Sequence, residues 1–141
     1  RQMCIRDRHK AHNAGALVNF THATMDDIAA KLTALSPDYI VSSLVFHQVP
    51  LAGKRKLLAA MYAGLRPGGQ LHIADYGWQR TALMRLGFRM VQTLDGYHDT
   101  QPNADGCIPV LMHEAGFAHI AETAVVPTVT GSISLYRATK L

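Results

Sequence analysis

The sequence predicts an α/β domain in which a parallel strand–helix–strand unit precedes a C-terminal antiparallel hairpin. Short apolar runs alternate with segments of helical periodicity along the 141 residues, a length that suits one domain. The last two apolar runs, 119–126 and 132–139, are joined only by the short turn 127–131, which is typical of a hairpin. The fold prediction therefore depends on the order of the elements.

The chain before residue 38 is the least regular part of the sequence. Residues 9–14 have the pattern of a helix tail, and Gly15 follows as a C-cap signal. Residues 16–23 predict a short strand, and 25–35 is compatible with a helix. The dipeptide Ser36-Pro37 ends that helix, because the residue before a proline disfavours the helical conformation.

The clearest elements lie between residues 38 and 75. Residues 38–46 contain a continuous apolar run, which is typical of a parallel strand that is buried on both faces. Residues 51–65 predict a helix that ends at Pro67-Gly68-Gly69, and 70–75 predicts the next strand. We expect a right-handed strand–helix–strand unit here. The apolar side chains on one face of its helix are Leu57, Leu58, Met61 and Leu65.

Two further helices and a loop separate this unit from the hairpin. Residues 95–105 are polar and predict a loop, and 107–115 predicts a short helix closed by Gly116. Residues 80–94 predict an amphipathic helix. Its apolar positions are Leu83, Leu86, Met90, Val91 and Leu94.

Charge and composition restrict the possible partners. The formal net charge is +4, but residues 1–8 carry +2 of it, so the balance of 9–141 predicts no nucleic-acid partner. Residues 1–8 look foreign to the fold and resemble the translated adapter sequence found at the ends of metagenomic reading frames. We therefore expect them to be a non-native leader.

The sequence also lacks the signals of several other protein classes. No apolar run approaches the roughly 20 residues that cross a bilayer, and the start of the chain has no apolar signal region. The two cysteines and eight histidines do not show metal-ligand spacing, so we expect no metal. These observations favour a cytoplasmic protein without a membrane partner.

Four motifs follow the order of the elements. Residues 38–49 contain an acidic residue, an apolar strand, a small polar pair and then a histidine. Residues 65–71 read Leu-Arg-Pro-Gly-Gly-Gln-Leu, 114–117 read Glu-Ala-Gly-Phe, and 131–140 form the last strand. Together they resemble the fourth to seventh strands of class I S-adenosylmethionine (SAM)-dependent methyltransferases. The resemblance implies a Rossmann-like parallel sheet with a C-terminal antiparallel hairpin, and makes 9–141 the C-terminal part of one methyltransferase domain.

The resemblance also implies that the first strands of this fold are missing. No Gly-x-Gly precedes Asp38, so the family's glycine loop and the acidic residue after its second strand are absent. In the family's sheet order, 3-2-1-4-5-7-6, this leaves 38–46 as an exposed edge strand and 17–20 without a neighbour. We expect 17–20 to be displaced or re-paired with 38–46. We also expect weak SAM affinity and no turnover from this chain alone.

The resemblance places the cofactor SAM at the carboxyl ends of the strands. Thr24, Met25 and Asp26 correspond to the residues that contact the adenine. An ordinary helix N-terminus capped by Thr24 fits these residues equally well. The methionine amino group would meet a second set of residues: Ser42, Ser43 and Leu44. The alternative for this set is a strand end that needs local hydrogen bonds.

Five side chains are candidates for the acceptor site, in addition to His47. His47 could act as a general base, because imidazole titrates near neutrality, or it could cap the next helix or line the pocket passively. The other candidates lie at the end of the strand at 70–75 or in the loop at 95–105: Asp75, Tyr76, Trp78, Tyr97 and His98. Each of them has a structural alternative as a cap, a packing residue or a solvated loop residue.

These residues and the resemblance lead us to expect SAM-dependent methyl transfer to a small-molecule acceptor. The basic run Lys54–Lys56 is interpreted as a solvated helix face. The alternative function is a non-enzymatic α/β interaction module without cofactor, which would bind a partner chain at the edge of 38–46. The methyltransferase interpretation requires 38–46 and 70–75 to lie side by side and parallel.

Overall fold

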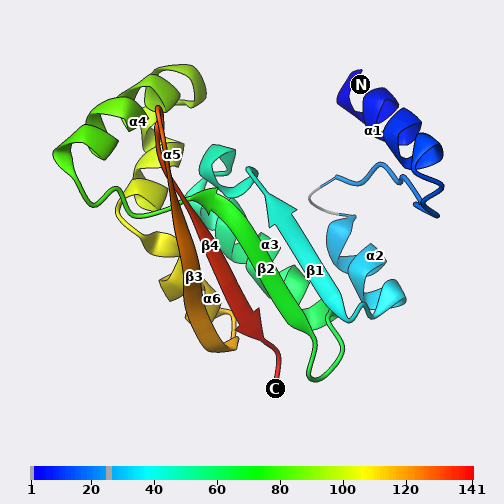
Figure 1. Ribbon diagram of the computed structural model, residues 1–141. Coiled ribbons are helices and arrows are strands. Elements are labelled where there is room, and N and C mark those ends of the chain that lie inside the picture. Colours follow the sequence, from blue (N-terminus) through cyan, green and yellow to red (C-terminus); the bar gives the residue numbers. More distant parts are fainter. Residues whose placement is uncertain (1, 25–26) are drawn as a thin grey trace.

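The protein forms one mixed four-stranded sheet with helices packed against it (Figure 1). The structure is a computed structural model that describes residues 2–24 and 27–141, with side chains from residue 8 onward. The strands are β1 (Tyr39–Ser43), β2 (Gln70–Tyr76), β3 (Ala118–Thr128) and β4 (Gly131–Thr139), and their order is β1-β2-β4-β3. The helices are α1 (Gln2–Asn13), α2 (Ile28–Leu35), the short 3-10 helix η1 (Phe46–Gln48), α3 (Leu51–Gly64), α4 (Ala82–Asp95), α5 (Tyr97–Ala104) and α6 (Cys107–Glu114).

The strand arrangement confirms the central prediction. β1 and β2 are parallel neighbours, with Tyr39 opposite Gln70 and Ser43 opposite Ala74. β4 runs antiparallel to β2 and to β3, so the C-terminal hairpin is confirmed. The hairpin strands are longer than predicted, because their pairing continues to Thr128 opposite Gly131. The carboxyl ends of β1 and β2 therefore meet at one edge of the sheet, as expected for parallel neighbours.

The hydrophobic core lies on one face of the sheet, under α3 and α6. Leu58 of α3 and Met112 of α6 pack in the same buried cluster as Leu71 and Ile73 of β2. This apolar burial stabilises the strand–helix–strand unit. Side chains of β2 alternate between buried and half-buried positions, which is the period-2 pattern of a sheet with one covered face.

The predicted burial of β1 on both faces is wrong. Ile40 is buried, but its neighbours Tyr39 and Val41 are 64% and 74% exposed. The reason is that the packed helices cover the Ile40 face, and among the described residues no strand pairs with the outer edge of β1. β1 is therefore the exposed apolar edge strand that the resemblance implied.

The predicted strand at 16–23 is also wrong. These residues follow the end of α1 at the left-handed Gly15, and they form neither helix nor strand. Leu17 is fully exposed and Val18 is about half-exposed, so the segment has no strand partner to satisfy its backbone. Figure 1 shows α1 and this segment away from the sheet. The segment 17–20 is thus displaced, one of the two outcomes that we expected.

α2 confirms the helix predicted at 25–35, although it begins later, at Ile28. It packs closely on α3, because a Cβ atom on Gly64 would lie only 2.5 Å from the Cβ atom of Leu32. A glycine at this position allows the two helices to approach.

The region between β2 and α6 differs from the prediction in two ways. The expected loop at 95–105 contains α5, which begins after Gly96 and is tied to β2 by a hydrogen bond from Asn103 Nδ2 to Tyr76 O (2.9 Å). α4 forms as predicted, but it packs through Phe88 and Val91. The other four apolar positions predicted for this helix are exposed: Leu83, Leu86, Met90 and Leu94.

No helix in the described part of the chain combines the length and the apolar character that a membrane span requires.

Candidate functional site

The candidate site is built where the chain leaves β1 and enters η1. Leu44 has a left-handed backbone (φ 53°), and its amide donates to Ala74 O at 2.9 Å. This turn directs the next three amides toward the end of β2. There the fully buried carboxylate of Asp75 receives all three of them: Val45 N (2.8 Å), Phe46 N (2.7 Å) and His47 N (3.3 Å).

Asp75 also fixes the ring of His47. The distance from His47 Nδ1 to Asp75 Oδ1 is 2.7 Å, and the amide of Tyr76 donates to the same oxygen at 2.8 Å. A carboxylate accepts hydrogen bonds, so the contact places a proton on Nδ1, and whenever the ring is neutral the lone pair is on Nε2. A histidine with this tautomer can receive a proton at Nε2.

A second carboxylate faces the other ring nitrogen. Asp95 Oδ2, at the C-terminal end of α4, lies 3.5 Å from His47 Nε2. The side chain of His47 is 5% exposed and that of Asp95 is 28% exposed, so solvent reaches this side of the pair. The carboxylate of Asp95 can therefore stabilise a positive charge on the ring after Nε2 takes up a proton.

Aromatic rings close the inner side of the site. The ring of Tyr76 meets the His47 ring edge-on with 5.0 Å between centroids, and its other neighbour is Phe88 of α4, also at 5.0 Å. The Tyr76 hydroxyl bonds Thr130 Oγ1 at 2.8 Å. These contacts hold Tyr76 in place as an apolar wall beside the imidazole.

Lys54 was predicted to lie on a solvated face, and this prediction is wrong. Its side chain is fully buried, and Nζ donates to Val49 O (2.6 Å) and to Asp99 O (2.7 Å). Burial lowers the pKa of Lys54, and the nearby Cys107, Asp99 and Asp75 oppose this shift. Lys54 thus ties the start of α3 to α5, next to the Asp75 centre.

Sequence spacing contained a signal for this burial. Lys54 precedes Leu57 and Leu58 by three and four positions, so it extends the apolar face of the helix that we predicted. Two other buried polar residues, Gln79 and Asn103, carried no such signal. Gln79 bonds Gly77 O at 2.8 Å and Ser132 N at 2.8 Å, and so connects the end of β2 to the start of β4.

The residues predicted to bind the methionine end of the cofactor lie at the edge of this site. Ser42 is buried, whereas Ser43 and Leu44 are exposed at the carboxyl end of β1. Their position follows from the parallel pairing of β1 with β2 and from the turn at Leu44. This strand end directly precedes the turn that leads to His47, and a role in cofactor binding stays a prediction.

The residues predicted to contact adenine are only partly described. Met25 and Asp26 lie outside the residues that the structure describes. Thr24 Oγ1 accepts from Asp27 N (3.3 Å) and Asp27 Oδ2 accepts from Thr24 N (3.3 Å), the reciprocal pattern of a helix capping box; Thr24 Oγ1 also donates to Asp27 Oδ2 (2.7 Å). These bonds support the capping alternative for Thr24, and they lower the pKa of Asp27.

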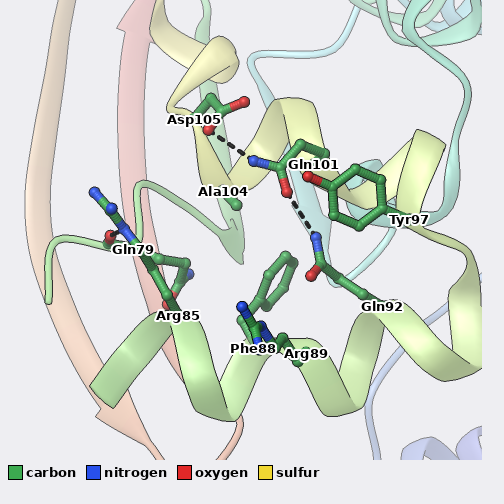
Figure 2. Close-up of a pocket in the computed structure, with 9 residues that line it drawn as sticks. All are labelled: Gln79, Arg85, Phe88, Arg89, Gln92, Tyr97, Gln101, Ala104 and Asp105. Carbon is green, nitrogen blue, oxygen red and sulfur yellow. Dashed lines mark hydrogen bonds between the residues drawn. The ribbon is translucent and has the colours of Figure 1, made fainter. Parts of the chain in front are cut away.

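Three predicted acceptor residues point elsewhere. Trp78 packs near Gly106 and stacks with the guanidinium of Arg80, 5.1 Å from its ring centroid. Tyr97 lines a cavity between α4 and α5 (Figure 2). His98 is almost fully exposed, and its Nδ1 lies 3.3 Å from Asp99 Oδ1. Of the predicted acceptor set, the structure brings only Asp75 and Tyr76 to His47.

No family model and no curated protein sequence matches this chain. Solved structures do match it. An O-methyltransferase family protein from Burkholderia thailandensis has a TM-score of 0.73 at 18% identity, over 99% of this chain and 40% of that one. TnmH has a TM-score of 0.64 at 18% identity, over 87% of this chain and 35% of that one.

A third match is human N-acetylserotonin methyltransferase in complex with SAM. Its TM-score is 0.54 at 18% identity, over 74% of this chain and 30% of that one. The chain therefore spans 30% to 40% of the length of these three structures. Over that part it has the fold of class I SAM-dependent methyltransferases.

Proposed function

We propose that this chain is part of a SAM-dependent methyltransferase that acts on a small-molecule acceptor, with His47 as the general base. The observation that carries the proposal is the His47–Asp75 pair at the carboxyl ends of two parallel strands. Ligands of such sheets bind at this edge. Support comes from the shared fold, which occurs in human N-acetylserotonin methyltransferase in complex with SAM.

The residues at the end of β1 fit one part of the cofactor. Ser43 and Leu44 are exposed there, and the left-handed turn at Leu44 separates them from the base at His47. In the proposal they hold the methionine end of SAM together with Ser42. Adenine contacts by Thr24, Met25 and Asp26 belong to the proposal as well. SAM supplies an electrophilic methyl group when bound.

In the proposed reaction His47 moves one proton. Asp75 holds Nδ1–H in place, so Nε2 accepts the proton of the acceptor as it attacks. The resulting imidazolium lies between Asp75 and Asp95, whose negative charges stabilise it. Tyr76 positions the acceptor by excluding water from one side of the ring.

The other residues predicted for the acceptor site have different places in the proposal. Asp75 acts through His47 and is a positioning residue. Trp78, Tyr97 and His98 contact other parts of the protein, so we assign them no acceptor contact here. Because the chain spans well under half of the matching structures, we propose weak SAM binding and no turnover for residues 1–141 alone.

A titration of the ¹⁵N-labelled chain with SAM tests the proposal. We expect millimolar binding, with amide shifts that concentrate on residues 42–48. ATP is the matched control, because it shares the adenosine of SAM but lacks the methionine, and it should leave Ser43 and Leu44 unshifted. Equal shifts with both ligands, or none up to 10 mM SAM, would remove the support for a cofactor site.

The exposed edge of β1 favours a second candidate, a non-enzymatic interaction module. Tyr39 and Val41 present apolar side chains beside unpaired backbone groups of this edge, which can accept an added strand. In that case SAM would leave the β1 amides unshifted. Increasing protein concentration would instead broaden the signals of residues 39–43.

A further inference from the structure

A second cavity lies between α4 and α5, apart from the His47 site. Its volume is about 250 Å³, and Figure 2 shows its lining side chains. Phe88, Arg85 and Arg89 come from α4, and Tyr97 and Gln101 come from α5. Phe88 separates this cavity from the candidate active site, because it is almost fully buried and its ring packs against Tyr76.

The cavity lining holds more positive than negative charge. Arg85 and Arg89 lie one helical turn apart, an arrangement in which like charges destabilise a helix. Among the described residues no carboxylate forms a salt bridge with either guanidinium. Arg85 Nε donates to Gln79 O (2.9 Å), which leaves its terminal nitrogens available. An anion in the cavity would relieve this repulsion.

The one acidic side chain that lines the cavity is already engaged. Asp105 Oδ1 accepts from Gln101 Nε2 at 2.9 Å, and Gln101 Oε1 accepts from Gln92 Nε2 at 2.8 Å. This chain of hydrogen bonds fixes the orientation of both amides (Figure 2). Asp105 keeps its negative charge but is held on the α5 side by Gln101, so the lining carries two guanidinium groups against one carboxylate and is positive on balance.

The cavity also has aromatic walls. Phe88 extends into the lining from α4, and Tyr97 extends into it from the α5 side (Figure 2). Aromatic walls favour a planar apolar body, and guanidinium groups favour a carboxylate that they can bind with two parallel hydrogen bonds. The volume of about 250 Å³ is below the ~300–1,000 Å³ of sites for drug-sized ligands, so the ligand must be compact.

We propose that the α4–α5 cavity binds a small aromatic carboxylate, with Arg89 and Arg85 on the carboxylate and Phe88 and Tyr97 on the ring. The site lies beyond the proposed methyl transfer and does not depend on it. Its ligand reaches α4 and α5 without contact with His47, because the Tyr76–Phe88 pair stands between the two sites.

Benzoate is the probe, and benzamide is its neutral counterpart of the same shape. Both are titrated into the full 141-residue chain at 150 mM salt, where general surface attraction is screened. We expect benzoate to bind with a Kd of about 1 mM, near the weak limit for such a small ligand, and benzamide to bind at least about tenfold more weakly. Amide shifts should cluster on residues 85–105.

Three variants separate a built site from general charge attraction. Arg89→Gln should weaken benzoate binding about tenfold, and Arg89→Lys should weaken it less, because it keeps the charge but loses the planar fork. Arg137→Gln removes the same charge from an exposed position on β4, outside the cavity, and should leave the Kd unchanged. Far-ultraviolet circular dichroism confirms that each variant is folded.

Several results would overturn the proposal. Equal affinity for benzoate and benzamide would show that the carboxylate is not recognised. Equal losses in Arg89→Gln and Arg137→Gln would show that only the net charge matters. Shifts that spread over the basic surface, with none on α4 and α5, would place the anion elsewhere.

Discussion

Asp75 should be the single most sensitive polar side chain of this fold. Its fully buried carboxylate accepts five hydrogen bonds, four from backbone amides and one from the His47 ring. Asp75→Asn keeps the size of the side chain and replaces one oxygen with an NH₂ group. The variant therefore removes one hydrogen-bond acceptor of Asp75 and leaves the packing of the side chain nearly unchanged.

The size of the effect follows from which oxygen is replaced. If the amide nitrogen of the asparagine replaces Oδ2, it faces the donors Val45 N and Phe46 N. If it replaces Oδ1, it faces the Tyr76 amide and the backbone N and ring Nδ1 of His47. At least two charge-assisted hydrogen bonds are lost in either orientation. At about 1.5–3 kcal/mol each, the free energy of unfolding should fall by about 3–6 kcal/mol. That is a large share of the ~5–15 kcal/mol that holds an ordinary domain folded.

Urea unfolding followed by circular dichroism measures this loss. Asp38→Asn is the matched control, because Asp38 is an exposed carboxylate paired with Arg66 at the surface, and its removal should change stability by less than about 1 kcal/mol. A loss below about 1 kcal/mol in Asp75→Asn, or equal losses in both variants, would refute the role of Asp75 as the centre of the loop.

Three further predictions concern buried and exposed side chains. Burial raises the pKa of the Cys107 thiol from 9.0 to about 11. In a Cys4→Ser chain at pH 8, a disulfide reagent should therefore react with Cys107 about 100-fold more slowly in the folded chain than in the chain unfolded by urea, and equal rates would contradict this. Burial lowers the pKa of Lys54 from its ordinary value of 10.5, so at a pH between the lowered and the ordinary pKa the unfolded chain holds a proton that the folded chain has released. The stability of the wild type should therefore rise with pH relative to that of Lys54→Met. Urea midpoints of the two proteins that run parallel from pH 7 to 10 would contradict this titration. Val41→Lys, at a position that is 74% exposed, should reduce self-association in light scattering and change the free energy of unfolding by no more than about 0.5 kcal/mol. Ile40→Lys, on the buried face of β1, should destabilise the chain. Similar losses of stability in both variants would argue against a sheet that is covered on one face only.

The sequence predicted the elements whose signals are local and periodic. The helix at 51–65 and the strand at 70–75 were correct, and the strand predicted at 38–46 forms over Tyr39–Ser43, because a strand and an amphipathic helix each leave a pattern in the chain. The last part of the predicted strand was wrong, since the chain turns at Leu44 and Phe46 begins η1. The helix α5 was missed because its residues are polar and include Pro102. Contacts made elsewhere stabilise it, such as the bond from Asn103 to Tyr76 O, and a local pattern does not contain them.

The failed predictions about burial have one physical cause. An apolar run indicates that a strand can be buried, but which faces are covered depends on the segments that pack against it. Val41 and Leu17 are both apolar and both exposed, because the described chain contains no element that covers them. In the same way the stripe from Leu83 to Leu94 was correctly recognised as apolar, yet α4 packs through the neighbouring face at Phe88.

The candidate site was only half predictable. His47 follows one predicted strand and Asp75 ends the next, so the resemblance identified both, but it assigned Asp75 to the acceptor and did not predict that it holds the histidine. The opposite carboxylate, Asp95, gave no signal at all. It reaches His47 Nε2 because α4 ends beside η1, and this is a consequence of tertiary packing.

Asp75 couples the position of the proposed base to the fold of the loop that carries it. The oxygen that holds His47 Nδ1 also accepts from the Tyr76 amide, so the ring keeps its orientation only while the end of β2 keeps its shape. Loss of activity in an Asp75 variant would therefore mix a misplaced loop with a missing base. His47→Gln separates the two effects, because it leaves Asp75 with its four backbone donors. If SAM still shifts the amide signals of Ser43 and Leu44 in His47→Gln but not in Asp75→Asn, the Asp75 carboxylate is needed for cofactor binding at the end of β1, and the His47 imidazole is needed only for proton transfer.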